Sequence, residues 1–161
     1  MSKSLYIFDV DGTLRMCNVP GQPCPNSPGE WEVIEQALPW FRRTHWQSTR
    51  IAFVSNQGGA GLGLLEETVA RRMLRDLWNV LLPEHVQGYI YMCPHRPKAG
   101  CDCRKPKPAL VLSAIADLGG NRSTTILVGD LDSDRLCAEA AGVDFSWAWD
   151  FFGTSQQRWP R

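Results

Sequence analysis

Two groups of acidic residues, far apart in the sequence, have the residue types and positions of a shared metal site. Asp9 and Asp11 stand at the end of the first apolar run, and Asp130, Asp132 and Asp134 follow a later one. Such short apolar runs are typical of buried parallel strands, and in a doubly wound sheet ligands bind at the carboxyl ends of the strands. Carboxylates brought together repel one another, and a hard divalent cation with oxygen ligands relieves the repulsion. The two groups therefore predict a magnesium site.

A second set of residues has the chemistry of a phosphate site. Ser55 and Asn56 follow an apolar run, and a hydroxyl group with neighbouring backbone amides can hold phosphate oxygens. Arg104 and Lys105 precede a predicted helix whose N-terminus also favours anions. We therefore expect a phosphate group to bind beside the carboxylates.

Three cysteines and one histidine lie close together in the sequence with the spacing of metal ligands. They are Cys93, His95, Cys101 and Cys103. Three thiolates and one imidazole form a closed tetrahedral zinc set of the structural type, whereas cysteines spaced C-x-C are poorly placed to bridge each other. Four protein ligands leave no open position for water, so we expect zinc to fold the loop at about 93–103 rather than to catalyse a reaction. The folded loop would place Arg104 and Lys105 at the rim of the pocket.

Hydrophobic periodicity predicts alternating strands and helices that position these residues. Strands are expected near residues 5–10, 50–55, 88–92, 125–129 and 143–147. Helices are expected to begin near Pro39 and to cover 64–82 and 109–118, where apolar residues recur at helical spacing. This alternation predicts an α/β fold with a three-layer, doubly wound and mainly parallel sheet. All 161 residues are expected to form one domain, 1–161.

The composition argues against several classes of partner. The 17 basic side chains balance the 17 acidic ones, so no global field attracts nucleic acid or an anionic membrane. The N-terminal apolar run is too short for a signal peptide, and no stretch approaches the ~18 apolar residues of a membrane span. We therefore expect a cytoplasmic monomer without a membrane segment.

The order of the motifs resembles that of one enzyme superfamily. Asp-x-Asp-Gly-Thr, Ser-Asn, Lys-Pro and Gly-Asp-x-x-x-Asp follow one another over nearly the whole chain. This order resembles the haloacid dehalogenase (HAD) superfamily of phosphohydrolases, subclass III, and implies its HAD-like Rossmannoid fold. Many members insert a cap domain between motifs. The intervals here hold only a loop with one helix, and a helix, a strand and the cysteine-rich loop, so we expect no separate cap domain and an open site.

The resemblance implies a role for each acidic residue. Asp9 would attack phosphorus and form an aspartyl phosphate. Asp11 would give a proton to the departing alcohol and later take one from water. Asp9, the backbone carbonyl of Asp11 and Asp130 would hold magnesium. Asp134 would orient Lys105 and support the metal ligands, with Asp132 as the alternative.

The resemblance also implies how the phosphate is held. Ser55 and the backbone of Asn56 would bind its equatorial oxygens, and Lys105 would neutralise the charge that builds up there. Lys105 is preferred to Lys107 because it comes first in Lys-Pro-x-Pro, as in the superfamily pattern. Arg104 would contact the substrate.

Two groups within the superfamily share segments with this chain. The cysteine-rich loop resembles that of heptose bisphosphate and histidinol phosphate phosphatases, which implies a small phosphorylated substrate. Val10 and Leu131, however, stand where that group usually carries basic residues. The segments 25–31 and 133–152 are similar to polynucleotide 3'-phosphatase domains, so 3'-phosphates at nucleic acid ends are an alternative substrate. A non-catalytic, zinc-stabilised binding module is a further alternative.

Aromatic residues are concentrated in the segments that resemble polynucleotide 3'-phosphatases. They are Trp31, Trp147, Trp149, Phe151 and Phe152. We interpret them as packing residues at the edge of the sheet, because aromatic side chains more often fill cores than stack on ligands. Were they exposed, they could stack bases beside an open site.

Overall fold

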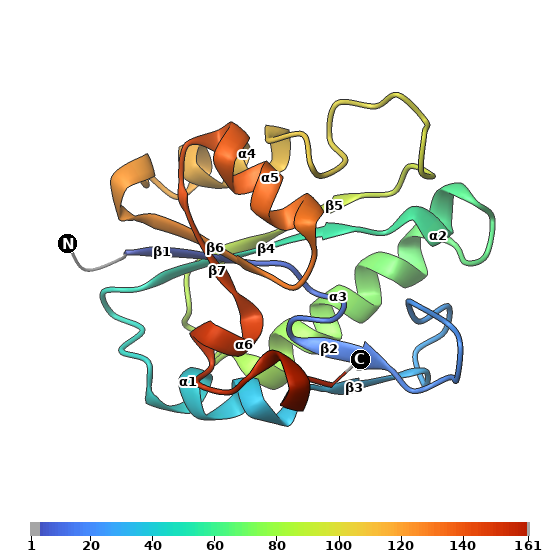
Figure 1. The fold of residues 1–161 in the computed structure, drawn as a ribbon, viewed down its shortest axis with the longest axis horizontal. Coiled ribbons are helices and arrows are strands. Elements are labelled where there is room, and N and C mark those ends of the chain that lie inside the picture. The colour runs from blue at the N-terminus through green and yellow to red at the C-terminus, as the bar shows by residue number, and fades with distance from the viewer. Residues whose placement is uncertain (1–3, 161) are drawn as a thin grey trace.

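A five-stranded parallel sheet forms the centre of the protein in the computed structural model, which describes residues 4–160 (Figure 1). Its strands pair only in parallel. Their spatial order is β5 (Gly88–Cys93), β4 (Arg50–Asn56), β1 (Leu5–Phe8), β6 (Thr125–Gly129) and β7 (Asp144–Trp147). This confirms the predicted parallel α/β sheet, with the two strands that precede the acidic groups, β1 and β6, side by side at its centre.

Helices cover both faces of the sheet and complete three layers (Figure 1). One face carries α4 (Ala109–Asp117) and α5 (Asp132–Ala141). The other carries α1 (Leu38–Arg43), α3 (Glu67–Leu81) and α6 (Ala148–Phe151). The short α2 (Gly58–Gly61) follows β4. Three 3-10 helices complete the helical elements of the described residues: Glu35–Ala37, Arg122–Thr124 and Gln156–Arg158.

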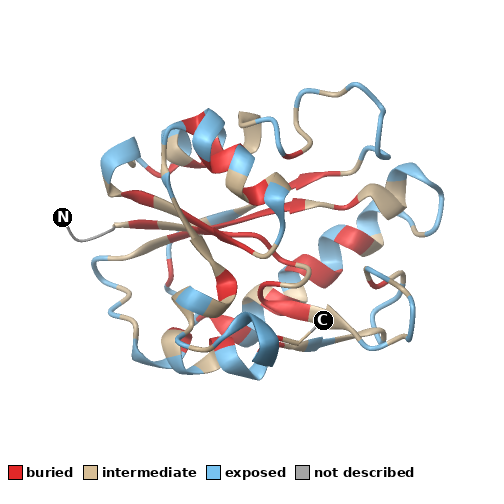
Figure 2. Ribbon diagram, in the orientation of Figure 1, coloured by how far each residue is buried: buried red, intermediate tan, exposed pale blue. Residues whose placement is uncertain are grey.

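The alternation of side chains along the strands separates two apolar cores. Figure 2 shows that the central strands are buried along much of their length. In β1, Leu5 and Ile7 pack with α4 and α5, whereas Phe8 packs on the opposite face with α1 and α3. Successive strand residues point to opposite faces, and a strand buried on both sides is therefore apolar throughout. α3 contributes one buried side at helical spacing, formed by Ala70, Met73, Leu74, Leu77 and Leu81.

The interval between β1 and β4 differs from the expected loop with one helix. It also contains an antiparallel hairpin, β2 (Arg15–Cys17) paired with β3 (Trp31–Val33). Each strand has 3 residues, too few for the alternating pattern that identifies a strand in a sequence. The hairpin is no separate cap domain, so the prediction of a capless fold is confirmed.

The C-terminal segment folds back onto the sheet. Phe152 stacks on Phe8 with ring centroids 6.0 Å apart, and Trp159 stacks on Phe152 at 5.7 Å. The indole Nε1 of Trp159 donates a hydrogen bond of 2.7 Å to the carbonyl oxygen of Gly12. The C-terminal segment thus contacts both β1 and the turn that follows it. Between residues 4 and 160, no helix is long and apolar enough to cross a membrane.

Candidate active site

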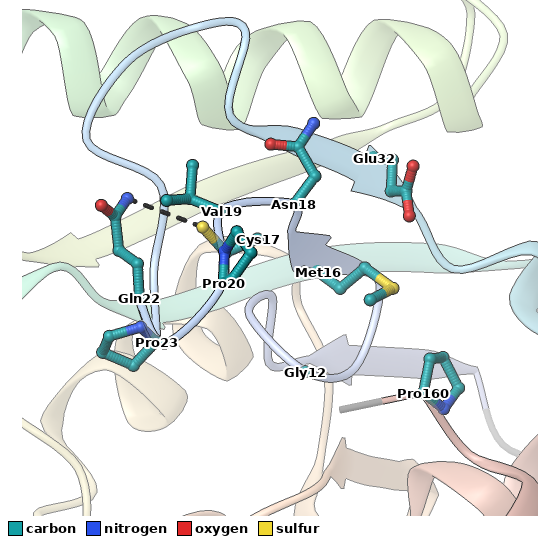
Figure 3. A pocket seen from close by; sticks show the side chains of 11 residues that line it. Gly12, Met16, Cys17, Asn18, Val19, Pro20, Gln22, Pro23, Glu32 and Pro160 are labelled. Atoms are coloured by element: carbon teal, nitrogen blue, oxygen red, sulfur yellow. Dashed lines mark hydrogen bonds between the residues drawn. The ribbon is translucent and has the colours of Figure 1, made fainter.

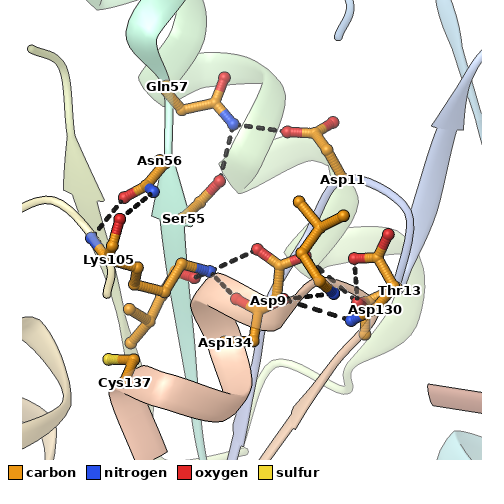
Figure 4. Close-up of polar contacts among 12 residues, drawn as sticks. Asp9, Asp11, Thr13, Ser55, Asn56, Gln57, Lys105, Asp130, Asp134 and Cys137 are labelled. Carbon is orange, nitrogen blue, oxygen red and sulfur yellow. Dashed lines mark hydrogen bonds and ion pairs between the residues drawn. The ribbon is translucent and has the colours of Figure 1, made fainter. Parts of the chain in front are cut away.

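Three aspartates from distant parts of the chain meet at the carboxyl ends of β1 and β6. Asp9 directly follows β1, Asp130 directly follows β6, and Asp134 lies in the first turn of α5. One carboxylate oxygen from each lies within 4.8 Å of the other two. Figure 4 shows the three side chains converging. The structure thus brings together three of the five aspartates that the sequence predicts to share a pocket.

The turn between Asp9 and Asp130 is tightly packed. A Cβ atom on Gly12 would lie 2.2 Å from Oδ2 of Asp130, and Gly12 has a φ of +86°. Glycine is therefore required at this position by both space and backbone conformation. Thr13 Oγ1 lies 3.1 Å from Asp9 Oδ2 and from Asp130 Oδ1, and it can donate its one proton to either.

Lys105 reaches into the centre of the acidic cluster. Its side chain is only 2% exposed, and its Nζ lies 2.5 Å from Asp9 Oδ1 and 2.7 Å from Asp134 Oδ1. It also donates to the backbone oxygen of Val54 at 2.8 Å. Burial alone would lower the pKa of Lys105, but attraction to the carboxylates of Asp9 and Asp134 outweighs it, and the pKa is raised above its ordinary value.

Asn56 fixes the backbone of Lys105 rather than facing the cavity with a free side chain. Its Nδ2 donates to the Lys105 carbonyl at 3.1 Å, and its Oδ1 accepts from the Lys105 amide at 3.0 Å. The ammonium group of Lys107 instead lies 2.7 Å from the carbonyl of Cys101 and 3.0 Å from Asp102. The geometry therefore singles out Lys105, not Lys107, as the lysine of the cluster.

The cluster holds more negative charge than one lysine can balance. Burial raises the pKa of Asp9 well above its usual range and repulsion from Asp134 raises it further, while Lys105 lowers it. Burial also raises the pKa of Asp130. Three carboxylates share one ammonium group, and an added cation with a preference for oxygen would relieve both the repulsion and the desolvation. This donor set fits a magnesium ion.

Asp134 and Asp132 occupy different environments although they share the first turn of α5. Asp134 is 1% exposed, and its Oδ2 accepts hydrogen bonds from the backbone amides of Asp130 (3.2 Å) and Leu131 (3.1 Å). Asp132 has a side chain 77% exposed and pairs with Arg135. Of the two candidates, Asp134 is the one that contacts the lysine and the loop of Asp130.

Asp11 belongs to a second polar network that the sequence predictions did not include. Arg15, which is fully buried, donates to Asp11 Oδ1 at 2.7 Å and to Oδ2 at 3.3 Å. Gln57 Nε2 donates to Asp11 Oδ2 at 2.6 Å and to Ser55 Oγ at 2.7 Å (Figure 4). Gln57 therefore links the hydroxyl predicted to bind phosphate with the carboxyl predicted to transfer protons.

The four predicted zinc ligands converge at the end of β5. The ligand atoms of Cys93, His95, Cys101 and Cys103 all lie within 4.8 Å of one another. The separations are 3.7 Å for Cys93 Sγ to Cys101 Sγ, 2.9 Å for Cys93 Sγ to Cys103 Sγ, and 3.2 Å for His95 Nδ1 to Cys103 Sγ. Tetrahedral bonds of about 2.3 Å separate two sulfur ligands by roughly 3.8 Å. The cluster could hold a metal ion of that kind.

A bound metal ion would also stabilise the thiolate forms of the cysteines in this cluster. The three cysteines form no disulfide, and burial, with hydrogen bonding to Cys103, raises the pKa of Cys93 to about 12. A thiol with such a pKa stays protonated at neutral pH, whereas coordination by a cation deprotonates it. Three sulfur atoms and one ring nitrogen favour zinc over magnesium or calcium, which prefer oxygen ligands.

A cavity of about 580 Å³ opens above the carboxylates. Its walls include Asp9, Asp11, Asn56, Lys105, Asp130 and Asp134, together with Arg104 from the cysteine-rich loop. Arg104 Nη1 donates to the carbonyl of His95 at 3.3 Å, which ties the cavity wall to the metal-ligand cluster. A second cavity of about 510 Å³ adjoins it beside β2 and the loop that follows (Figure 3). Gly12, Pro23 and Pro160 line both cavities.

Comparison with known proteins decides the family. A family model described as HAD-hydrolase-like matches residues 102–147. The chain is 33% identical over 132 residues to a probable D-glycero-D-manno-heptose-1,7-bisphosphate 7-phosphatase of Thermoplasma volcanium, covering 80% of this chain and 85% of the relative. The chain belongs to the HAD phosphatase family.

The phosphatase has further relatives of the same kind. It is 36% identical over 152 residues to the D-glycero-beta-D-manno-heptose-1,7-bisphosphate 7-phosphatase of Vibrio cholerae, covering 89% of this chain and 79% of the relative. Its fold is similar to the crystal structure of the D,D-heptose 1,7-bisphosphate phosphatase from Bordetella bronchiseptica, with a TM-score of 0.75, 27% identity, and coverage of 88% of this chain and 78% of the other. That protein was crystallised with magnesium and phosphate. The predicted superfamily and the predicted phosphatase class are therefore confirmed.

Proposed function

We propose that the phosphatase is a magnesium-dependent phosphomonoesterase of small phosphorylated metabolites, the kind of substrate that includes the sugar bisphosphates named for its relatives. The observation that carries the proposal is the convergence of Asp9, Asp130, Asp134 and Lys105 beside one cavity. Asp9, the backbone carbonyl of Asp11 and Asp130 would hold magnesium, supported by Asp134. The bound ion supplies positive charge that lets an anionic nucleophile approach an anionic phosphate.

The chain's own residues divide the reaction between them. A carboxylate oxygen of Asp9 attacks phosphorus, the bond to the alcohol oxygen breaks, and Asp11 delivers a proton to that oxygen. Water then attacks the aspartyl phosphate, Asp11 takes a proton from it, and the carboxylate of Asp9 is restored. Arg15 and Gln57 orient the carboxyl group of Asp11.

The transferring phosphoryl group is held by separate donors. Ser55 Oγ and the backbone amide of Asn56 bind its equatorial oxygens, and Lys105 neutralises the charge that develops on them. Arg104 lies on the cavity wall, where it can contact the substrate beyond the phosphorus atom. A non-catalytic binding module would have no use for this set of nucleophile, proton carrier and oxyanion donors.

One observation keeps nucleic acid ends as a second candidate substrate. Trp149 lines the capless cavity and Trp147 stacks on it, and both rings are partly exposed. An open cavity with an aromatic wall is also suited to a 3'-phosphorylated strand end.

Phosphate release from a panel of substrates tests the function. Heptose 1,7-bisphosphate, histidinol phosphate and a 3'-phosphorylated oligonucleotide should be compared side by side with magnesium present. We expect a small metabolite to be hydrolysed more efficiently than the oligonucleotide, and hydrolysis to stop when magnesium is chelated. Preference for the oligonucleotide would favour the second candidate, and lack of turnover of these three and of a generic aryl phosphate would contradict the phosphatase proposal.

The role of Asp11 can be tested through the leaving group. Asp11→Asn should slow hydrolysis of an alkyl phosphate by about 10²- to 10⁴-fold, because a poor leaving group needs a proton as it departs. An activated aryl phosphate should lose much less, because its leaving group departs as a stable anion. The quantity to compare is the rate constant measured under single-turnover conditions. Equal losses of this rate constant for the two substrates would argue against Asp11 as the general acid.

We propose that zinc occupies the cysteine-rich loop and stabilises it. Cys101→Ser should abolish bound zinc and lower Tm by about 5 °C or more, because about 1 kcal/mol shifts the Tm of a domain this size by roughly 2–4 °C. Activity should fall as well, since the loop carries Arg104 and Lys105. Cys17→Ser is the matched control, because Cys17 lies outside the cluster and should keep both zinc and Tm. Wild-type protein that melts normally without zinc would disprove the structural role.

A further inference from the structure

The lining of the catalytic cavity includes aromatic and apolar residues as well as charged ones. They are Pro23, Leu131, Trp149, Trp159 and Pro160. Leu131 is 57% exposed, and Trp149 is partly exposed. A large exposed apolar residue beside a catalytic cavity is a candidate contact for the organic part of a substrate.

Part of this lining continues into an outer groove of about 520 Å³. The groove is lined by Asp130, Leu131, Asp132, Trp147, Trp149 and Gln156. Three of these residues, Asp130, Leu131 and Trp149, also line the catalytic cavity. The groove therefore adjoins that cavity, and Trp149 lies where the two meet.

Trp149 is supported by a row of aromatic rings. The rings of Trp147 and Trp149 are parallel to within 7°, with centroids 5.0 Å apart. Phe145 packs edge-on against Trp147 at 4.9 Å and 87°. These rings come from β7 and from α6, which directly follows it (Figure 1). A ring supported in this way presents a fixed flat surface and loses little conformational entropy when it binds a ligand.

The charges around the groove do not suit a second phosphate group. Its lining contains neither lysine nor arginine. Of its two carboxyl groups, that of Asp130 is proposed to hold magnesium and that of Asp132 pairs with Arg135. The cations that line the adjoining cavity are Arg104 and Lys105, and Lys105 is already paired with Asp9. An uncharged ring matches this lining better than an anion does.

We propose that Trp149, backed by Trp147, binds a flat unsaturated ring in the alcohol part of the phosphatase's substrate. This inference rests on the proposed phosphomonoesterase function and names the substrate class within it. Aromatic pairs stabilise by about 0.5–1.5 kcal/mol beyond the area they bury, which is roughly a 2- to 12-fold effect. The ring is therefore recognised by its flatness and its π-electrons, and not by size alone.

Two substrates that differ only in the ring test the proposal. Benzyl phosphate and cyclohexylmethyl phosphate have similar size and the same type of primary alcohol as leaving group. We expect kcat/KM for benzyl phosphate to be about fivefold higher, mainly through a lower KM. Turnover of both substrates with equal kcat/KM would overturn the ring proposal and leave the phosphatase function standing. Failure to hydrolyse either one, or a generic aryl phosphate, would contradict both.

Variants of Trp149 locate the preference. Trp149→Leu should abolish the preference, so that kcat/KM becomes equal for benzyl phosphate and the cyclohexylmethyl ester, and Trp149→Phe should restore most of the preference. Tyr89→Leu, at an exposed tyrosine on β5, is the matched control and should keep the preference. A preference that persists in Trp149→Leu, with the variant folded by circular dichroism, would remove Trp149 from the substrate site.

Discussion

Replacing Asp9 with asparagine should reduce steady-state turnover by at least about 10⁴-fold, the scale of effect seen when a catalytic nucleophile is removed. The amide has nearly the shape of the carboxyl group but cannot attack phosphorus. It also removes one of the oxygens that would hold magnesium. Phosphate release with a generic aryl phosphate, followed over hours at high enzyme concentration, measures the loss.

The stability of Asp9→Asn separates a catalytic defect from a folding defect. A carboxyl group whose pKa is raised by folding destabilises the folded state once the pH exceeds its unfolded pKa. Because burial raises the pKa of Asp9, the substitution should leave Tm unchanged or higher when no cation is present. The increase in Tm that magnesium gives the wild type should shrink.

A control on the same protein completes this test. Asp117→Asn changes an exposed aspartate at the end of α4, which accepts a hydrogen bond from Tyr91, and should keep wild-type turnover. Turnover above contamination in Asp9→Asn, with a normal magnesium effect on Tm, would show that another residue attacks phosphorus.

Most of the central sheet was predictable because β1, β4, β5 and β6 each contain a short, continuous apolar run, whereas β7 (Asp144–Trp147) does not. Both faces of β1 and β4 are covered by helices, so the central residues of these strands are apolar. The strand predicted over residues 5–10 ends earlier in the structure, at Phe8, and the difference has a physical cause. Val10 is fully buried but already belongs to the turn that carries Asp9 and Asp11. An apolar residue in a sequence indicates that the position is buried, not that it lies in a strand. Because the buried positions continue past Phe8, the apolar run extends beyond the end of β1.

The metal-ligand cluster was predictable for a different reason. Its four side chains lie close together in the sequence, at the end of β5 and in the loop that follows, and this short spacing favours their meeting. The aspartates needed more: Asp9 and Asp130 meet only because β1 and β6 are neighbours in the sheet. The order of the motifs, through its resemblance to the superfamily, predicts that these two strands are neighbours. Hydrophobic periodicity predicts the strands but not their order in the sheet.

The residues missed by the sequence predictions act through buried side chains. Arg15 belongs to none of the four sequence motifs. Its contact with Asp11 depends on its position in β2, a strand that the sequence did not predict. Gln57 could have been predicted from its position, two residues after Ser55. In the structure it donates a hydrogen bond to Ser55. The aromatic run was interpreted as packing, which holds for Phe151 and Phe152. Trp149 both packs against the core and lines the cavity.

Replacing Lys105 with methionine should have the largest combined effect on stability and activity. Methionine preserves the length and apolar character of the stem but leaves Asp9 and Asp134 buried without their cation. Removing one partner of a buried ion pair typically destabilises a protein by about 3–5 kcal/mol. Activity should fall by at least about 10³-fold, because the variant loses the charge that we propose to stabilise the transferring phosphoryl group.

The pH dependence of the destabilisation distinguishes lost charge from lost packing. The pKa of Lys105 is raised in the folded state, so its contribution is fully present at neutral pH and would disappear only as the pH rises through that folded pKa. In the variant, protonation of the unpaired carboxyl groups relieves their repulsion. Urea unfolding should therefore show a smaller deficit at pH 5 than at pH 8. Lys107→Met, two residues further on with its ammonium group on the cysteine-rich loop, should show neither the activity loss nor this pH dependence. A deficit of the same size at both pH values would mean that Lys105 stabilises the site through packing and not through its charge.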